Sequence, residues 1–101
     1  MKMPIVNGAN GGDGAKLVAE WLPNAGALTE SSARRAIGDL EKAAYQLSGE
    51  TQGNAFYILG AAYFRMNNAD DGCNYWTKAR PLVSGNSAEM INRLFATMGC
   101  K

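Results

Sequence analysis

Residues 51–80 read TQGNAFYILGAAYFRMNNADDGCNYWTKAR, the part of the chain with the clearest signals of local structure. Its first half places apolar side chains three and four residues apart, a spacing that predicts a helix over residues 51–67. The Asn67-Asn68 pair is typical of a turn, and helical spacing resumes at Ala69. Two helices joined by so short a turn run antiparallel, so this stretch predicts a helix hairpin.

Charged residues mark the two ends of the second helix. Asp70 and Asp71 lie in its first turn, while Lys78 and Arg80 lie near its end, just before Pro81. This order complements the helix dipole. Adjacent carboxylates on a helix point about 100° apart, so compensation of the dipole explains the aspartate pair better than metal binding does.

Helical periodicity continues on both sides of the hairpin. Upstream, it predicts a short helix over residues 15–22, a turn over residues 24–28 and a long helix over residues 29–47. Downstream, it predicts a last helix over residues 87–98. No alternation typical of β-strands is present, so the expected fold class is all-α, with about five helices arranged as antiparallel hairpins.

Several polar residues and glycines are expected to fix the helix ends. Thr29 is a predicted N-cap, and Ser48-Gly49 is predicted to end the long helix. Asn86 and Glu89 have the spacing of a capping box at the start of the last helix.

The first 14 residues differ in composition from the rest of the chain. They are rich in glycine and asparagine, and glycine loses much backbone freedom on ordering. We therefore predict a flexible leader over residues 1–14, either a linker or an ordered loop, and a helical domain over residues 15–101.

Composition narrows the classes of function. The chain of 101 residues has 10 basic and 9 acidic residues, so no strong charge points to nucleic acid or an anionic membrane. No apolar stretch approaches the ~20 residues of a membrane span. The chain has no histidine and only two cysteines, which removes the commonest general base and excludes a four-thiolate metal site within one chain. We expect no catalytic residue, no cofactor and no metal.

The hairpin resembles a tetratricopeptide repeat, in which two helices pack closely and further repeats stack on them. Its first helix carries the matching residues Phe56, Leu59, Gly60 and Tyr63, with phenylalanine where tryptophan is common. Its second helix carries Gly72, Trp76 and Ala79 at the expected spacings.

The resemblance covers residues 53–86, and Pro81 comes three residues earlier than the usual terminal proline. Gly60 and Gly72 are expected to let the two backbones approach closely, with Trp76 and Tyr63 filling the groove. The helix over residues 29–47 is a weaker echo of a preceding repeat, and the last helix is a candidate closing helix. The alternative is an ordinary helical bundle whose aromatic stripe is core.

The family holds extended peptides or helices on a concave face lined by the first helix of each repeat. The resemblance implies that this face carries the partner-binding residues Asn54, Tyr57, Ala61, Phe64 and Arg65. Exposed aromatic and arginine side chains suit partner binding. The alternative is that the short helix over residues 15–22 folds across this face and buries the aromatic rings. Family members that grip a C-terminal carboxylate use a lysine and an asparagine where Tyr57 and Ala61 stand here, so such a clamp is not expected.

The two cysteines lie at equal distances from the loop between the last two helices. Residues equidistant from the turn of an antiparallel hairpin lie at the same level, so Cys73 and Cys100 are expected to form a disulfide. The bond would indicate an oxidising compartment such as the bacterial periplasm or envelope. Two independent thiols in a cytoplasmic protein are the alternative.

The leading hypothesis is a protein-interaction adaptor that binds a peptide or helix of a partner, in the manner of assembly or pilot factors in a bacterial envelope or secretion system. A second hypothesis is a structural subunit that self-associates, because few repeats leave apolar surface at both ends. A third is a thiol redox protein that uses Cys73 near a helix N-terminus.

Overall fold

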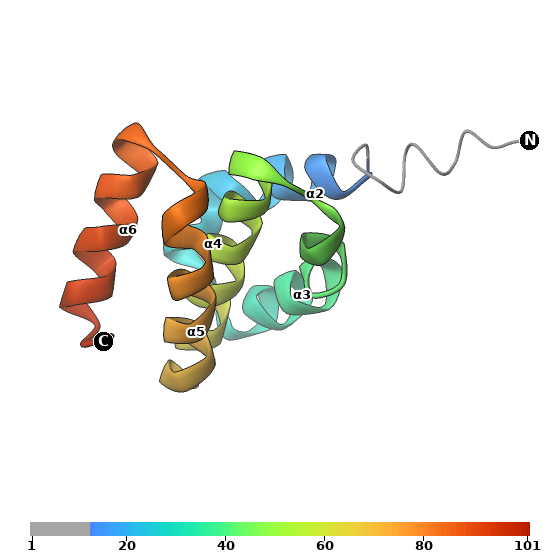
Figure 1. The fold of residues 1–101 in the computed structure, drawn as a ribbon. Coiled ribbons are helices and arrows are strands. Elements are labelled where there is room, and N and C mark those ends of the chain that lie inside the picture. The colour runs from blue at the N-terminus through green and yellow to red at the C-terminus, as the bar shows by residue number, and fades with distance from the viewer. Residues whose placement is uncertain (1–12) are drawn as a thin grey trace, which may run out of the picture.

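The computed structural model describes residues 13–101, which form five α-helices and three 3₁₀ segments without a strand (Figure 1). The all-α prediction is confirmed. In chain order the elements are α2 (Asp13–Trp21), η2 (Leu22–Ala27), α3 (Glu30–Leu40), η3 (Ala43–Gln46), α4 (Gly49–Arg65), α5 (Ala69–Ala79), η4 (Arg80–Leu82) and α6 (Gly85–Thr97).

The helix α4 forms the centre of the domain. Other elements pack on several faces of α4. These contacts bury apolar side chains on more than one side of the helix. Helix α3 lies on one side and α5 on the other, while α6 stands at the edge of the molecule beside α5 (Figure 1). The buried residues of α4 are Gly53, Ala55, Phe56, Tyr57, Ile58, Leu59, Gly60 and Ala62.

The turn between α4 and α5 is fixed by backbone hydrogen bonds. Asn67 has a positive φ of 65°, a conformation that asparagine tolerates better than most residues. The Asn68 N–H donates to Tyr63 O at 2.8 Å and the Asn67 N–H to Phe64 O at 3.0 Å, which is a Schellman motif. The Asn68 side chain then accepts from the Asp71 N–H and caps α5. The predicted turn and the start of the second helix at Ala69 are confirmed.

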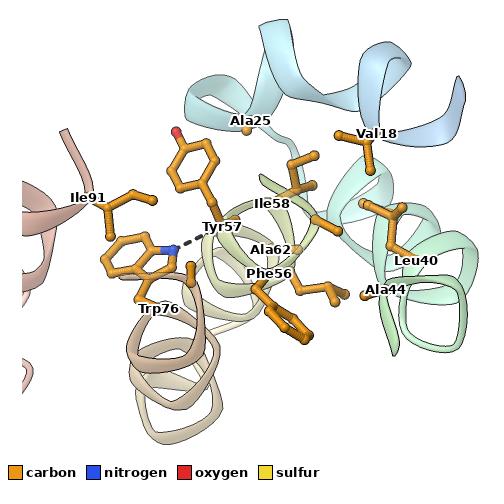
Figure 2. Packing of buried hydrophobic residues seen from close by; sticks show 14 of the residues in the cluster. Val18, Ala25, Leu40, Ala44, Phe56, Tyr57, Ile58, Ala62, Trp76 and Ile91 are labelled. Atoms are coloured by element: carbon orange, nitrogen blue, oxygen red, sulfur yellow. Dashed lines mark hydrogen bonds between the residues drawn. The ribbon is translucent and has the colours of Figure 1, made fainter. Parts of the chain in front are cut away.

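Two glycines bring α4 and α5 into close contact, as predicted. A Cβ atom on Gly60 would collide with the Trp76 ring and lie 2.9 Å from Gly72 O, and one on Gly72 would lie 2.6 Å from the Phe64 ring. Trp76 fills the groove and donates its indole N–H to Tyr57 O at 3.0 Å (Figure 2). Tyr63 instead stacks on Tyr75, on the side of the hairpin that faces α3.

The predicted long helix over residues 29–47 is wrong beyond Leu40. Helix α3 ends there, and after a short turn the chain forms the 3₁₀ segment η3. The segment that follows contacts α4 instead of extending α3, since the Gln52 side-chain amide donates to Ala44 O at 3.0 Å. The predicted N-cap at Thr29 is confirmed, since its side chain accepts from the Ser32 N–H at 3.1 Å.

Three further boundaries differ from the sequence predictions. Residues expected to form a turn at 24–28 belong largely to η2, which starts beside Pro23. Gly49 begins α4 with a φ of 62° rather than ending the preceding helix. Helix α6 begins at Gly85, two residues before the prediction, and its N-cap Ser84 accepts no side-chain capping bond, so the Asn86–Glu89 capping box does not start this helix.

The predicted leader lies mostly outside the described residues. Helix α2 begins at Asp13, so Gly14, which composition assigned to the leader, lies inside a helix. Gly14 is buried, and a Cβ atom there would lie 3.2 Å from the Leu47 side chain. The packed domain therefore includes at least this part of the glycine-rich segment.

Candidate functional site

A pocket of about 290 Å³ lies where η2, α4, α5 and α6 meet. We call it the seam pocket, because α6 closes it against the rest of the domain. Its lining is mainly apolar and includes three aromatic rings. The lining residues are Ala25, Gly26, Leu28, Tyr57, Ala61, Phe64, Arg65, Trp76, Leu94 and Met98.

Four of the five residues that the resemblance selected line this one pocket. They share the face of α4 that points towards η2 and α6, and they are Tyr57, Ala61, Phe64 and Arg65. Asn54, the fifth, is half-buried and does not line it. Helical spacing thus correctly predicted which residues of α4 lie together on one face, and this face lines the pocket.

The expectation that Tyr57 is exposed is wrong. Its side chain is only 5% exposed, because its ring lies between the Trp76 ring and η2, near Ala25 (Figure 2). The two rings are stacked with centroids 6.4 Å apart. Burial raises the pKa of the Tyr57 hydroxyl above its usual value of 10.0. Burial of the aromatic rings by an upstream segment was the alternative expectation from the sequence. This holds for the Tyr57 ring, although η2 rather than α2 covers it.

Phe64 occupies an intermediate position. It is half-buried, with its ring centroid 4.5 Å from that of Trp76, and it also covers Gly72. The ring therefore contributes both to the contact between α4 and α5 and to the wall of the pocket. This double role follows from its place near the C-terminal end of α4.

Arg65 is exposed at the margin of the seam pocket. Its Nε–H donates to Leu28 O at 2.9 Å, so the guanidinium is tied to the chain just after η2. This bond joins residues 37 positions apart and was not predictable from the pattern of α4 alone.

Leu94 of helix α6 and Met98 at its C-cap supply the outer wall. The end of α6 is held by a disulfide between Cys73 and Cys100, whose Cα atoms lie 5.5 Å apart. The Cys100 N–H donates to Phe95 O at 2.9 Å in a second Schellman motif, which turns Cys100 back towards α5. The predicted pairing of the cysteines is confirmed.

A polar cluster lies on the opposite side of the hairpin, against α3. The hydroxyls of Tyr63 and Tyr75 both donate to Glu41 Oε2, the second at 3.2 Å. Desolvation and the Glu41 carboxylate raise the pKa of Tyr63 to about 12 and the pKa of Tyr75 further. Sequence reasoning missed this cluster, because its members come from three separate elements.

Six of the ten lining residues of the seam pocket were not selected from the sequence. Ala25, Gly26 and Leu28 come from a segment expected to be a simple turn, and Met98 was expected only as part of a closing helix. No local signal identifies these residues, since their place depends on how η2 and α6 fold back over α4.

Among residues 13–101, no group of three or more cysteine, aspartate or glutamate side chains is placed to hold a metal ion. No helix in this range combines the length and apolarity needed to cross a bilayer. A second, smaller hollow is lined by Glu20, Trp21, Asn24 and Arg35.

Comparison of the chain with protein families, with curated proteins and with solved structures found no match. The likeness to tetratricopeptide repeats therefore rests on the motif in α4 and α5.

Proposed function

We propose that the chain is a protein-interaction domain that binds a peptide or helix of a partner through the seam pocket. The carrying observation is that four residues, selected from the sequence as a binding face, line one pocket with α6. Aromatic rings and a flexible methionine provide large apolar contact surface, and such side chains dominate binding hot spots.

The size of the pocket suits one or two side chains of a partner. Pockets for whole small molecules occupy about 300–1,000 Å³, and the seam pocket lies at the lower limit of this range. In this proposal α4 and α5 form one tetratricopeptide-like repeat, and α6 acts as the first helix of a closing repeat. The partner then lies across α4 and α6.

The disulfide supports a place in an oxidising compartment. We propose the periplasm or cell envelope of a bacterium, with a role as an assembly or pilot factor of an envelope or secretion system. A cytoplasmic protein with reduced thiols is the alternative. Alkylation of thiols in the native compartment before denaturation distinguishes them, since modification of Cys73 and Cys100 there would contradict the envelope placement.

A self-associating subunit is the second candidate. It is favoured by the exposure of two large apolar residues, Met90 on α6 at 37% and Met98 at the C-cap of this helix at 46%. Sedimentation equilibrium over a range of concentrations separates the two candidates. The adaptor proposal expects a monomer, whereas the subunit proposal expects a concentration-dependent oligomer.

Selection from a phage-displayed library of random 12-residue peptides tests the binding role without knowledge of the partner. The Ala61→Leu variant fills the pocket from α4, and Ala19→Leu makes the same change at an exposed position of α2 outside it. We expect peptides selected on the unmodified protein to bind Ala19→Leu equally and Ala61→Leu at least about tenfold more weakly. Equal binding to both variants would contradict the assignment of the pocket.

A further inference from the structure

The seam pocket contains a single charged side chain. Nine of its ten lining residues are apolar, aromatic or glycine, and the tenth is Arg65. A cation at the margin of an apolar pocket favours a ligand that joins an apolar group to a negative charge. The charge of the pocket is therefore informative about its occupant.

The geometry of Arg65 leaves part of its guanidinium available. Its Nε–H is already bonded to Leu28 O, which fixes the plane of the group at the pocket margin. The two terminal amino groups form no hydrogen bond or ion pair within residues 13–101, where the one ion pair joins Arg34 and Glu30. A fixed guanidinium loses less rotamer freedom on binding than a free one and can hold both oxygens of a carboxylate.

We propose that the seam pocket recognises an internal peptide segment of a partner in which an aspartate or glutamate lies beside a large apolar side chain. The carboxylate binds the terminal amino groups of Arg65, and the apolar side chain packs against Trp76 and Leu94. This inference rests on the proposed function and adds the chemistry of the partner.

The lining favours a side-chain carboxylate over the carboxylate at a chain end. A chain-end clamp uses several donors around one group, but the neighbouring positions on α4 hold Tyr57 and Ala61, and the Tyr57 side chain is buried. One arginine matches one carboxylate. The remaining lining is mainly apolar, which suits an adjoining leucine or aromatic side chain.

Peptide selection separates this inference from the function on which it rests. Selection on the oxidised protein from the random 12-residue library is expected to enrich peptides that combine an acidic and a large apolar residue. Enrichment of peptides without acidic residues would overturn the inference and leave the binding role standing. Recovery of no peptide that discriminates against Ala61→Leu would overturn both.

A double-mutant cycle then tests the contact itself. The selected peptide is synthesised with glutamate or with glutamine at the acidic position, and each form is titrated against the unmodified protein and Arg65→Gln. We expect the change to glutamine to weaken binding about tenfold in the unmodified protein and less than about twofold in Arg65→Gln. Arg34→Gln, on the exposed face of α3, is the matched control and should keep the tenfold preference.

Equal losses in the unmodified protein and in Arg65→Gln would overturn the proposal. If Arg65→Gln does not fold, the salt dependence of the unmodified protein gives the same decision. Its affinity for the glutamate peptide should fall more steeply with added salt than its affinity for the glutamine peptide. Parallel salt dependences, or a dimer that Ala61→Leu dissociates, would overturn the proposal.

Discussion

The α4–α5 hairpin and helix α6 are neighbours in the chain, but different forces hold them. In the hairpin, the glycines at positions 60 and 72 allow backbone contact, and Trp76 fills the space between the helices. Only two residues of helix α6 are buried in the core, Ile91 and Phe95. Its far end is fixed by the disulfide.

The hairpin is therefore held by close steric fit, whereas α6 is held mainly by a covalent restraint. A close-packed groove is sensitive to one added methyl group, because its neighbours have no space to yield. A helix with few buried contacts depends instead on whatever limits its freedom when the packing loosens. The seam pocket lies between these two regions, so one wall is set by packing and the other by the disulfide.

Removal of the disulfide should have the largest effect on this comparison. The disulfide closes a loop of 28 residues, counting both ends. Its removal in Cys73→Ser/Cys100→Ser lowers the free energy of unfolding by about 3–4 kcal/mol in the chain-entropy model. Chemical denaturation of the oxidised protein and the double variant measures the loss.

Amide hydrogen exchange locates the part of the protein that loses stability when the disulfide is removed. Amides of α6 should lose protection by a larger factor than amides of α4, measured relative to the global unfolding of each protein. Equal protection of α6 with and without the disulfide would show that packing alone holds this helix, and the comparison would fail.

A methyl group in the hairpin groove should have the next largest effect. Gly60→Ala places a Cβ atom in the Trp76 ring and close to Gly72 O, and overpacking of this kind costs about 1–3 kcal/mol. Gly38→Ala is the matched control, because nothing lies within 4 Å of a Cβ atom at this exposed position of α3. We expect the control to raise stability by about 0.5–1 kcal/mol. Similar changes in the two variants would contradict the proposed fit.

The polar cluster of Glu41, Tyr63 and Tyr75 anchors the hairpin on the side away from α6. Tyr63→Phe removes a donor to Glu41 and should lower the free energy of unfolding by about 1 kcal/mol at neutral pH. Thermal or chemical denaturation at pH 7 measures this change.

The same tyrosine should make stability depend on alkaline pH. Its pKa is raised from 10.0 to about 12 in the folded protein, so its contribution is complete below pH 10. Between pH 10 and 12 the unfolded state releases this proton first, and the contribution is lost. Tyr63→Phe should therefore show a shallower fall in stability across this range than the unmodified protein. Identical slopes would exclude Tyr63 as a source of the pH dependence.

The smallest effect is expected at a polar contact of α6. Arg80 Nε donates to Asn92 Oδ1 at 2.9 Å in an exposed setting, and the Arg80 guanidinium also lies 4.4 Å from the centre of the Phe95 ring. Asn92→Ala removes the bond but introduces a better helix former, so stability should change by less than about 0.5 kcal/mol. A loss above 1 kcal/mol would mean that polar contacts, rather than the disulfide, hold α6.

The hairpin could be predicted from the sequence because its signals are local. Helical spacing, the Asn67-Asn68 turn and the glycines all act within a few residues, and α4 lies within two residues of the predicted helix at both ends. The cysteine pairing was predictable because antiparallel helices match positions about their loop.

The η3 segment that follows α3 and the full seam pocket involve contacts between different segments of the chain. The bond from Gln52 to Ala44 and the bond from Arg65 to Leu28 each join separate elements. Sequence periodicity identifies which residues share a face of α4, but it does not say what covers that face. Tyr57 was therefore placed on the correct face with the wrong exposure.

If a partner's apolar side chain binds in the seam pocket, the two indole N–H groups of the chain should report it differently. Trp76 lines this pocket, whereas Trp21 lines the smaller hollow and donates to Asp39. The ¹⁵N-labelled oxidised protein is titrated with a peptide selected on it, and both indole signals are followed by NMR. We expect the Trp76 signal to shift to saturation while the Trp21 signal stays in place. A saturating shift of Trp21 alone, or binding that leaves Trp76 unchanged, would contradict binding in the seam pocket.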